Sequence, residues 1–137
     1  MAYDKSNIFA KILRGEIPSI KVYEDAHTLA FMDIMPVSKG HTLVIPKSDA
    51  ENIFDLDAAA AGPLLLATQK VARAVKAAVQ APGVMIAQLN GPAAGQTIFH
   101  IHFHIIPRWK EDLSLHGRAQ ADVKELEETA KLIRAQL

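Results

Sequence analysis

The chain has 137 residues and no cysteine; half of its residues are apolar, 22% are charged, and its formal net charge at pH 7 is zero. This composition is typical of one soluble globular domain that is large enough to bury a core, and it excludes disulfides and thiolate chemistry. Zero net charge provides no bulk attraction to polyanions, so we expect neither nucleic acid nor a membrane as a partner.

Neither a targeting segment nor a membrane segment is indicated. Residues 1–5 lack an apolar signal core, and no apolar run approaches the length of a membrane span. We therefore expect a cytoplasmic protein in which residues 1–137 form a single domain.

The first half of the chain predicts a short helix followed by three strands. Ser6 and Asn7 can cap a helix that runs to about Arg14, and Gly15 is well placed to end it. Strands are predicted over residues 20–23, 28–33 and 41–46. The third is nearly continuous in apolar residues, so we expect it near the centre of the sheet.

The second half predicts two helices and two further strands. A long helix capped by Asp55 or Asp57 should reach about Gln80, because its apolar residues recur at helical spacing and can cover a sheet face. Strands over 84–90 and 100–106 follow, and a C-terminal helix begins at about Ala119. The order of elements predicts an α+β fold with a five-stranded, mainly antiparallel sheet. The stripe of the long helix consists of Leu64, Val71, Val75 and Val79, and that of the C-terminal helix of Val123, Leu126, Ala130, Ile133 and Leu137.

Three histidines, His100, His102 and His104, alternate with apolar residues in the last predicted strand. A spacing of two is the strand period, so the three rings should point to one face. A purely structural row is one interpretation, although each ring would need its own polar partner if buried. A zinc site is a second interpretation, but the Cα atoms of the outer two histidines would lie ~13 Å apart. In addition, no Asp or Glu that could orient the rings lies between Asn90 and Lys110. The favoured interpretation is histidine acting as nucleophile, acid and anion donor.

Other polar residues leave two interpretations open. Asp33 closes an apolar strand, where it could serve a turn or accept hydrogen bonds from sugar hydroxyls. The loop over 90–97 contains two glycines, so its backbone could approach an anion closely or could simply join two strands. His27 and His116 are expected to be solvated.

The histidine row resembles the signature of the histidine triad (HIT) family, His-φ-His-φ-His-φ-φ, where φ is apolar. The resemblance covers roughly residues 6–110 and is closest to the Hint-like branch with its bacterial members. It implies one HIT domain with its core over 6–110 and a C-terminal helical extension over 118–137. The matching motifs are Asn7-Ile-Phe-Ala-Lys-Ile, Gly15-Glu-Ile-Pro-Ser, Phe31-Met-Asp-Ile-Met-Pro, Gly40-His-Thr-Leu-Val-Ile-Pro-Lys, Asn90-Gly, Ala94-Gly-Gln-Thr and His100-Ile-His-Phe-His-Ile-Ile.

The resemblance implies a purine nucleotide as the ligand and a homodimer in which two sheets join. It implies cleavage of nucleoside 5'-phosphoramidates or related AMP conjugates at the α-phosphate, through a covalent nucleotidyl-histidine. Neither a cofactor nor a metal is implied, and the zinc-binding Cys-x-x-Cys of many relatives is replaced here by Asn7 and Ala10. Two alternatives remain, namely a dinucleoside polyphosphate hydrolase and a nucleotide-binding scaffold whose hydrolysis is incidental.

The same resemblance implies residue roles. His102 matches the nucleophile, and the flanking His100 and His104 are expected to orient it and to donate to phosphate oxygens. Thr97 could donate to a phosphate or leaving-group oxygen, and His41 has an auxiliary role. Asp33 is expected to bind the ribose hydroxyls. The phosphate loop corresponds to Asn90, Gly95, Gln96 and Thr97, and the apolar positions around the base to Phe9, Ile12, Ile17, Phe31, Ile34 and Leu43.

Overall fold

The structure is a computed structural model that describes residues 2–117 and 119–137. It confirms the predicted α+β class: five antiparallel strands form one open sheet on which three helices pack. The elements in chain order are α1 (Ile8–Leu13), β1 (Lys21–Glu24), β2 (Thr28–Met32), β3 (Thr42–Pro46), α2 (Ala58–Val79), β4 (Gly83–Ala87), a short 3-10 turn (Pro92–Ala94), β5 (Phe103–Arg108) and α3 (Val123–Arg134).

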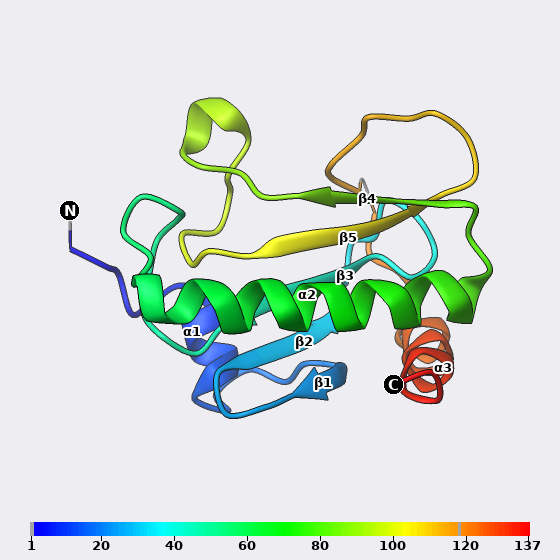
Figure 1. The fold of residues 1–137 in the computed structure, drawn as a ribbon, viewed down its shortest axis with the longest axis horizontal. Helices are drawn as coiled ribbons and strands as arrows, with labels where there is room; N and C mark the ends of the chain where they lie inside the picture. The colour runs from blue at the N-terminus through cyan, green and yellow to red at the C-terminus, as the bar shows by residue number, and fades with distance from the viewer. Residues whose placement is uncertain (1, 118) are drawn as a thin grey trace.

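The sheet is ordered β1-β2-β3-β5-β4, and every neighbouring pair is antiparallel. β3 lies at the centre and all of its residues are buried, as its continuous apolar run predicts. β1 and β4 form the two edges of the sheet. In Figure 1, α2 lies along one face of the sheet and α3 packs near one end of α2 and near β1.

The strand period divides the apolar residues of β2 and β3 between two faces. Ala30, Met32 and Val44 face the larger core, which α2 and α3 cover. The intervening residues point the other way and pack with α1. This smaller core consists of Phe9, Leu29, Phe31, Leu43 and Ile45. A short helix covers much less of a sheet face than α2 does, so the α1 face has room for a cavity.

The long helix forms as the sequence predicts. Asp57 caps it by accepting a hydrogen bond from the Ala59 N–H. Leu64, Val71 and Val75 are at most 1% exposed on its inner face, and full burial of such side chains stabilises a fold by about 1.5–3 kcal/mol each. No helix among the described residues is both long and apolar enough to cross a membrane.

The C-terminal helix is shorter than expected. It is capped by Asp122 and begins at Val123, so the preceding residues from Ala119 that the structure describes lie outside it. The middle of the predicted stripe is buried, but Val123 and Leu137 are 62% and 42% exposed. Each of these two residues lies at or beyond a helix terminus, where the face that packs on the domain ends.

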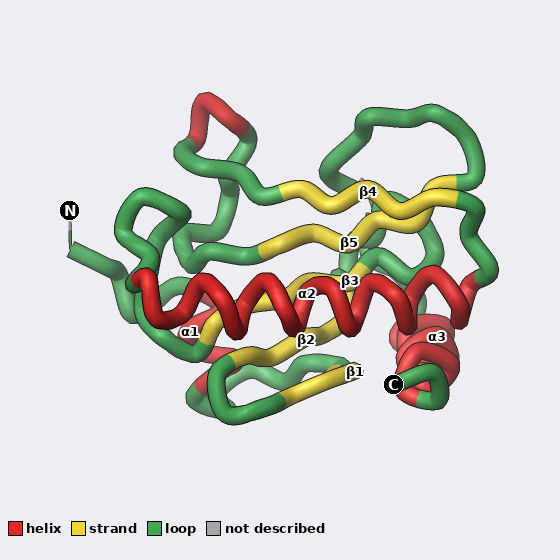
Figure 2. Tube along the Cα trace, viewed as in Figure 1, coloured by secondary structure: helices red, strands yellow, loops and turns green. Residues whose placement is uncertain are grey.

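The strand with the histidines begins later than the period-two pattern predicts. β5 starts at Phe103, so His100 and His102 lie in the irregular segment before it. The Ile101 N–H donates to the Ala50 carbonyl, which belongs to no strand, so the regular ladder cannot extend to this point. Figure 2 shows this segment as part of the long loop between β4 and β5, while a second long loop joins β5 to α3.

Candidate active site

A cavity of about 440 Å³ opens on the α1 face of the sheet. It brings together every apolar position that the resemblance assigns to the base. These wall residues are Phe9, Ile12, Ile17, Phe31, Ile34 and Leu43. The polar residues Asp33, Thr97, His102 and His104 line the same cavity, so a single site contains both an apolar slot and a cluster of polar groups.

Two of the expected phosphate-loop side chains lie elsewhere. The Asn90 side-chain oxygen accepts a hydrogen bond from the Ile53 N–H at 2.8 Å. The Gln96 amide accepts from the Gly91 N–H and donates to the Glu51 carbonyl. Neither residue lines the cavity, since these bonds fasten the loop to its surroundings. Their side chains therefore shape the loop and do not face the site.

His102 presents an unprotonated nitrogen to the cavity. Its Nδ1 lies 2.7 Å from the His100 carbonyl oxygen, which can only accept, so Nδ1 carries the proton and Nε2 carries the lone pair. The Phe9 ring packs against this imidazole at a centroid distance of 4.9 Å and an angle of 89°, which restrains its orientation. Burial lowers the pKa of His102 to about 4, so the ring is neutral at pH 7.

His104, unlike His102, has its proton on the nitrogen that faces the site. The Val37 N–H donates to Nδ1 of His41, so His41 carries its proton on Nε2 and donates it to Nδ1 of His104 at 3.0 Å. The proton of His104 is therefore on Nε2, a buried atom without a partner among the described residues. Burial lowers the pKa of His41 to about 4 and that of His104 to about 3, so both rings are neutral. His104 thus offers a neutral N–H donor to a ligand.

His100 does not line the cavity. Its Nε2 donates to the Pro46 carbonyl at 2.8 Å, and its Nδ1 accepts from the Tyr3 hydroxyl at 2.5 Å. The Asn7 amide in turn donates to the Tyr3 hydroxyl at 2.8 Å. Both ring nitrogens are therefore hydrogen-bonded within the protein. His100 has no free nitrogen for the donation to a phosphate that the resemblance implied. Its carbonyl holds His102, which makes it a positioning residue.

Asp33 serves the turn and also faces the cavity. One carboxylate oxygen accepts from the Met35 N–H at 2.8 Å and closes the turn after β2. The other lies 3.4 Å from Nε2 of His41, and the side chain lines the cavity, where it can accept from a ligand hydroxyl. Burial raises the pKa of the Asp33 carboxyl above its usual value.

Asp33, His41 and His104 offer ligand atoms within 4.8 Å of one another, the spacing of a possible metal site. The His41 and His104 nitrogens that face each other already share a hydrogen bond. A cation could bind there only if His41 moved its proton to Nδ1, where it would face the N–H of Val37. The donor set is therefore committed to hydrogen bonding. At the positions of the Cys-x-x-Cys of relatives, the Asn7 side chain caps α1 and Ala10 is buried.

The sequence interpretation missed His116. The residue is exposed, as expected for a solvated histidine, but it lines the cavity together with Gly117. Its Nε2 lies 3.0 Å from the Gly95 carbonyl, and its ring lies edge-on to His104 at a centroid distance of 6.1 Å. The only signal in the sequence is a histidine beside a glycine in the segment that follows the triad. Trp109, which follows the triad segment closely in the sequence, is not among the described residues that line the cavity.

Comparison with known proteins agrees with this geometry. The profile of the HIT domain matches residues 14–111. The Hit protein of Bacillus subtilis is 50% identical over 102 residues, which are 74% of this chain and 70% of the relative. An adenosine 5'-monophosphoramidase of Schizosaccharomyces pombe is 42% identical over 110 residues, 80% of each chain. The crystal structure of a Hit-like protein from Bartonella henselae, described as involved in cell-cycle regulation and solved with an unknown ligand, has a TM-score of 0.94 at 50% identity and covers all of both chains. This chain therefore belongs to the HIT family.

Proposed function

We propose that this protein is a hydrolase that cleaves nucleoside 5'-phosphoramidates or related AMP conjugates at the α-phosphate. The observation that carries the proposal is the pair of opposed ring nitrogens at one end of an apolar cavity: the lone pair of His102 beside the unpartnered N–H of His104. Membership of the HIT family supports a nucleotide-binding hydrolase. The phosphoramidase activity named for the fission yeast relative supports this choice of substrate.

In the proposed reaction, Nε2 of His102 attacks the α-phosphorus. The P–N bond to the leaving amine breaks, and the amine takes the electron pair and a proton. Thr97 lines the cavity, and its hydroxyl is a candidate donor of that proton. The intermediate is a nucleotidyl-histidine whose positive ring keeps its Nδ1–H on the His100 carbonyl.

Water completes the cycle by attacking the same phosphorus. The bond from phosphorus to His102 breaks, its electron pair returns to Nε2, and a proton of the water replaces the one that Thr97 gave to the amine. AMP and the amine are the products. The His104 N–H would donate to a phosphate oxygen in both steps and stabilise the charge that develops there.

The binding of the nucleotide follows from the same cavity. The apolar walls accept a flat base, and Asp33 accepts from the ribose hydroxyls. Because these walls carry few polar groups, a purine is favoured by its contact area and not by hydrogen bonds to its edge.

Single-turnover kinetics with intact-mass detection test the proposal. Wild-type protein mixed with adenosine 5'-phosphoramidate should gain the mass of a nucleotidyl group and then lose it as AMP appears. His102→Ala should form no adduct and release no AMP, while His27→Ala, at an exposed turn histidine, should behave as wild type. Normal turnover by His102→Ala would refute His102 as the nucleophile. Faster turnover of diadenosine polyphosphates would favour the alternative hydrolase, and binding without turnover would favour a scaffold.

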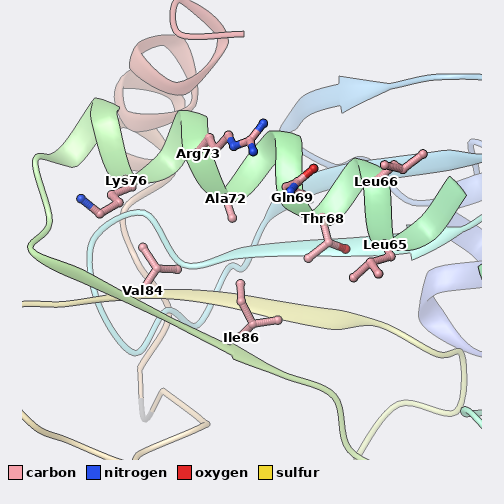
Figure 3. Close-up of a pocket in the computed structure, with 9 residues that line it drawn as sticks. All are labelled: Leu65, Leu66, Thr68, Gln69, Ala72, Arg73, Lys76, Val84 and Ile86. Carbon is pink, nitrogen blue, oxygen red and sulfur yellow. The ribbon is translucent and has the colours of Figure 1, made fainter. Parts of the chain in front are cut away.

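We also propose that two copies join through β4. This strand is an edge of the sheet, and its outer side has no partner strand among the described residues. Side chains of α2 and β4 line a groove of about 520 Å³, and Figure 3 shows them lying between these two elements. Leu65, Leu66 and Ile86 in this groove are 61%, 66% and 44% exposed, which is unusual for such residues unless a second surface covers them.

Light scattering after size exclusion tests this assembly. The wild type should have the mass of a dimer, and Ile86→Lys should shift it toward the monomer, because a charge would be buried in the interface between the two copies. Ile53→Lys is the matched control, since Ile53 is 50% exposed but does not line the groove. A monomeric wild type would contradict the proposal.

A further inference from the structure

The loop that joins β5 to α3 is fastened against the wall of the cavity. Gly117 packs so closely that an added Cβ would lie 2.1 Å from the carbonyl oxygen of Met35. A few residues later, the Ala121 N–H donates to the Ile34 carbonyl at 2.9 Å. These contacts hold the loop to the turn that follows β2 and place His116 at the mouth of the cavity.

His116 is oriented by the loop on the other side of the mouth. Its Nε2 faces the carbonyl oxygen of Gly95 at 3.0 Å and must donate to it, because a carbonyl can only accept. Gly95 can present this carbonyl because its backbone has a positive φ of 96°. The remaining nitrogen, Nδ1, is the ring atom that a ligand could reach.

No lysine or arginine is among the described residues that line the cavity. The rings of His41, His102 and His104 are neutral, and the charge of Asp33 has the same sign as that of a phosphate. Arg108, at the end of β5, is occupied by Asp112 and by the Ser114 carbonyl within the same loop. His116, unlike these buried rings, is exposed at the cavity, where water can solvate a positive charge.

We propose that His116 is a further substrate-binding residue, which contacts the phosphate-bearing end of the substrate from the loop between β5 and α3. This inference rests on the proposed function, since it assumes that the cavity binds a nucleotide. When a phosphate enters, Nδ1 of His116 is protonated and donates to a phosphate oxygen, while Nε2 keeps its bond to Gly95. His116 and His104, whose rings lie edge-on to one another, then hold the phosphate from two sides.

A comparison of two ligands tests the inference. Calorimetry should show that His116→Gln weakens AMP binding about tenfold, or about 1.4 kcal/mol, and leaves adenosine binding unchanged. His27→Gln, the matched control at an exposed histidine outside the cavity, should bind both ligands as wild type does. Equal loss for both ligands, or no loss for either, would overturn the inference. A wild type that binds no AMP would overturn the proposed function and this inference together.

Gly117→Ala provides a second measurement that leaves the imidazole in place. The added methyl group cannot fit against Met35, so the loop must move and carry His116 away. This variant should lose AMP affinity as His116→Gln does; wild-type affinity would contradict the assigned geometry. In NMR spectra of the wild type, AMP should shift the resonances of the His116 ring, and adenosine should not. The same change with both ligands would also overturn the inference.

Discussion

Tyr3→Phe removes a single hydroxyl group that reaches the histidine row from outside the sheet. In the native protein this hydroxyl lies 2.5 Å from Nδ1 of His100, whose side chain is fully buried. The substitution leaves a buried acceptor without a donor, which costs about 1–3 kcal/mol of unfolding free energy. The Asn7 amide loses an acceptor but keeps its second bond, 2.8 Å from the Asp4 carbonyl, so it adds little. Urea denaturation should measure the full loss.

The same variant should also slow catalysis. His100 holds Nδ1 of His102 through its carbonyl, so a less restrained His100 should lower kcat several-fold, while KM changes little because Tyr3 does not line the cavity. Tyr23→Phe is the matched control: its hydroxyl donates to Asp25, which keeps three other hydrogen bonds. If both variants lose the same stability and neither loses activity, then the hydroxyl of Tyr3 does not position the row.

Three further predictions concern the site and the core. The rate should stay near its full value as pH falls from 7 to about 5 and should decline near pH 4, where His102 becomes protonated. The unfolded chain takes up this proton nearer pH 6.5, so the free energy of unfolding should fall as the pH drops from about 6.5 to 4, and circular dichroism must accompany the assay. A decline of the rate near pH 6.5 would contradict the effect of burial on His102. Asp33→Asn should weaken AMP binding by about tenfold or more but leave the binding of the 2',3'-dideoxy analogue unchanged. If calorimetry shows the same loss of affinity for both ligands, then Asp33 serves only the turn. Ile133→Ala, at a fully buried position of α3, should lower the free energy of unfolding in urea by about 2–5 kcal/mol. Leu132→Ala, at a residue that is 47% exposed on the same helix, should lower it by about 0.5 kcal/mol or less. Similar losses of stability in both variants would contradict the packing of α3.

The helices and strands could be predicted where local signals decide them. Asp57 caps α2, and its apolar stripe at helical spacing becomes buried against the sheet. The start of β5 could not be predicted, because it depends on the bond from Ile101 to Ala50, a residue far away in the sequence. The start of α3 was within reach, since Asp122 is an ordinary capping residue, but the expected helix began at Ala119.

The site could be predicted where a residue type has few structural uses. The apolar wall, Asp33 and the pair His102 and His104 all meet in one cavity. Gln96 illustrates the limit: an amide that faces a phosphate and one that fastens a loop look the same in a sequence, because each group both donates and accepts. His116 was missed for a different reason, since it reaches the cavity only because its loop folds back onto the turn at Met35.

The direction of every proton in the histidine row is determined by backbone groups, which the sequence pattern does not reveal. A neutral imidazole has one donor and one acceptor, so fixing one nitrogen fixes the other. The Val37 N–H at one end directs His41 and His104 so that an N–H points outward, and the carbonyl of His100 directs His102 so that a lone pair does. Reversing either ring would break a bond to the backbone. A lone pair and an N–H donor thus stand on neighbouring rings, 4.9 Å apart between centroids, and the proposed displacement at phosphorus uses both.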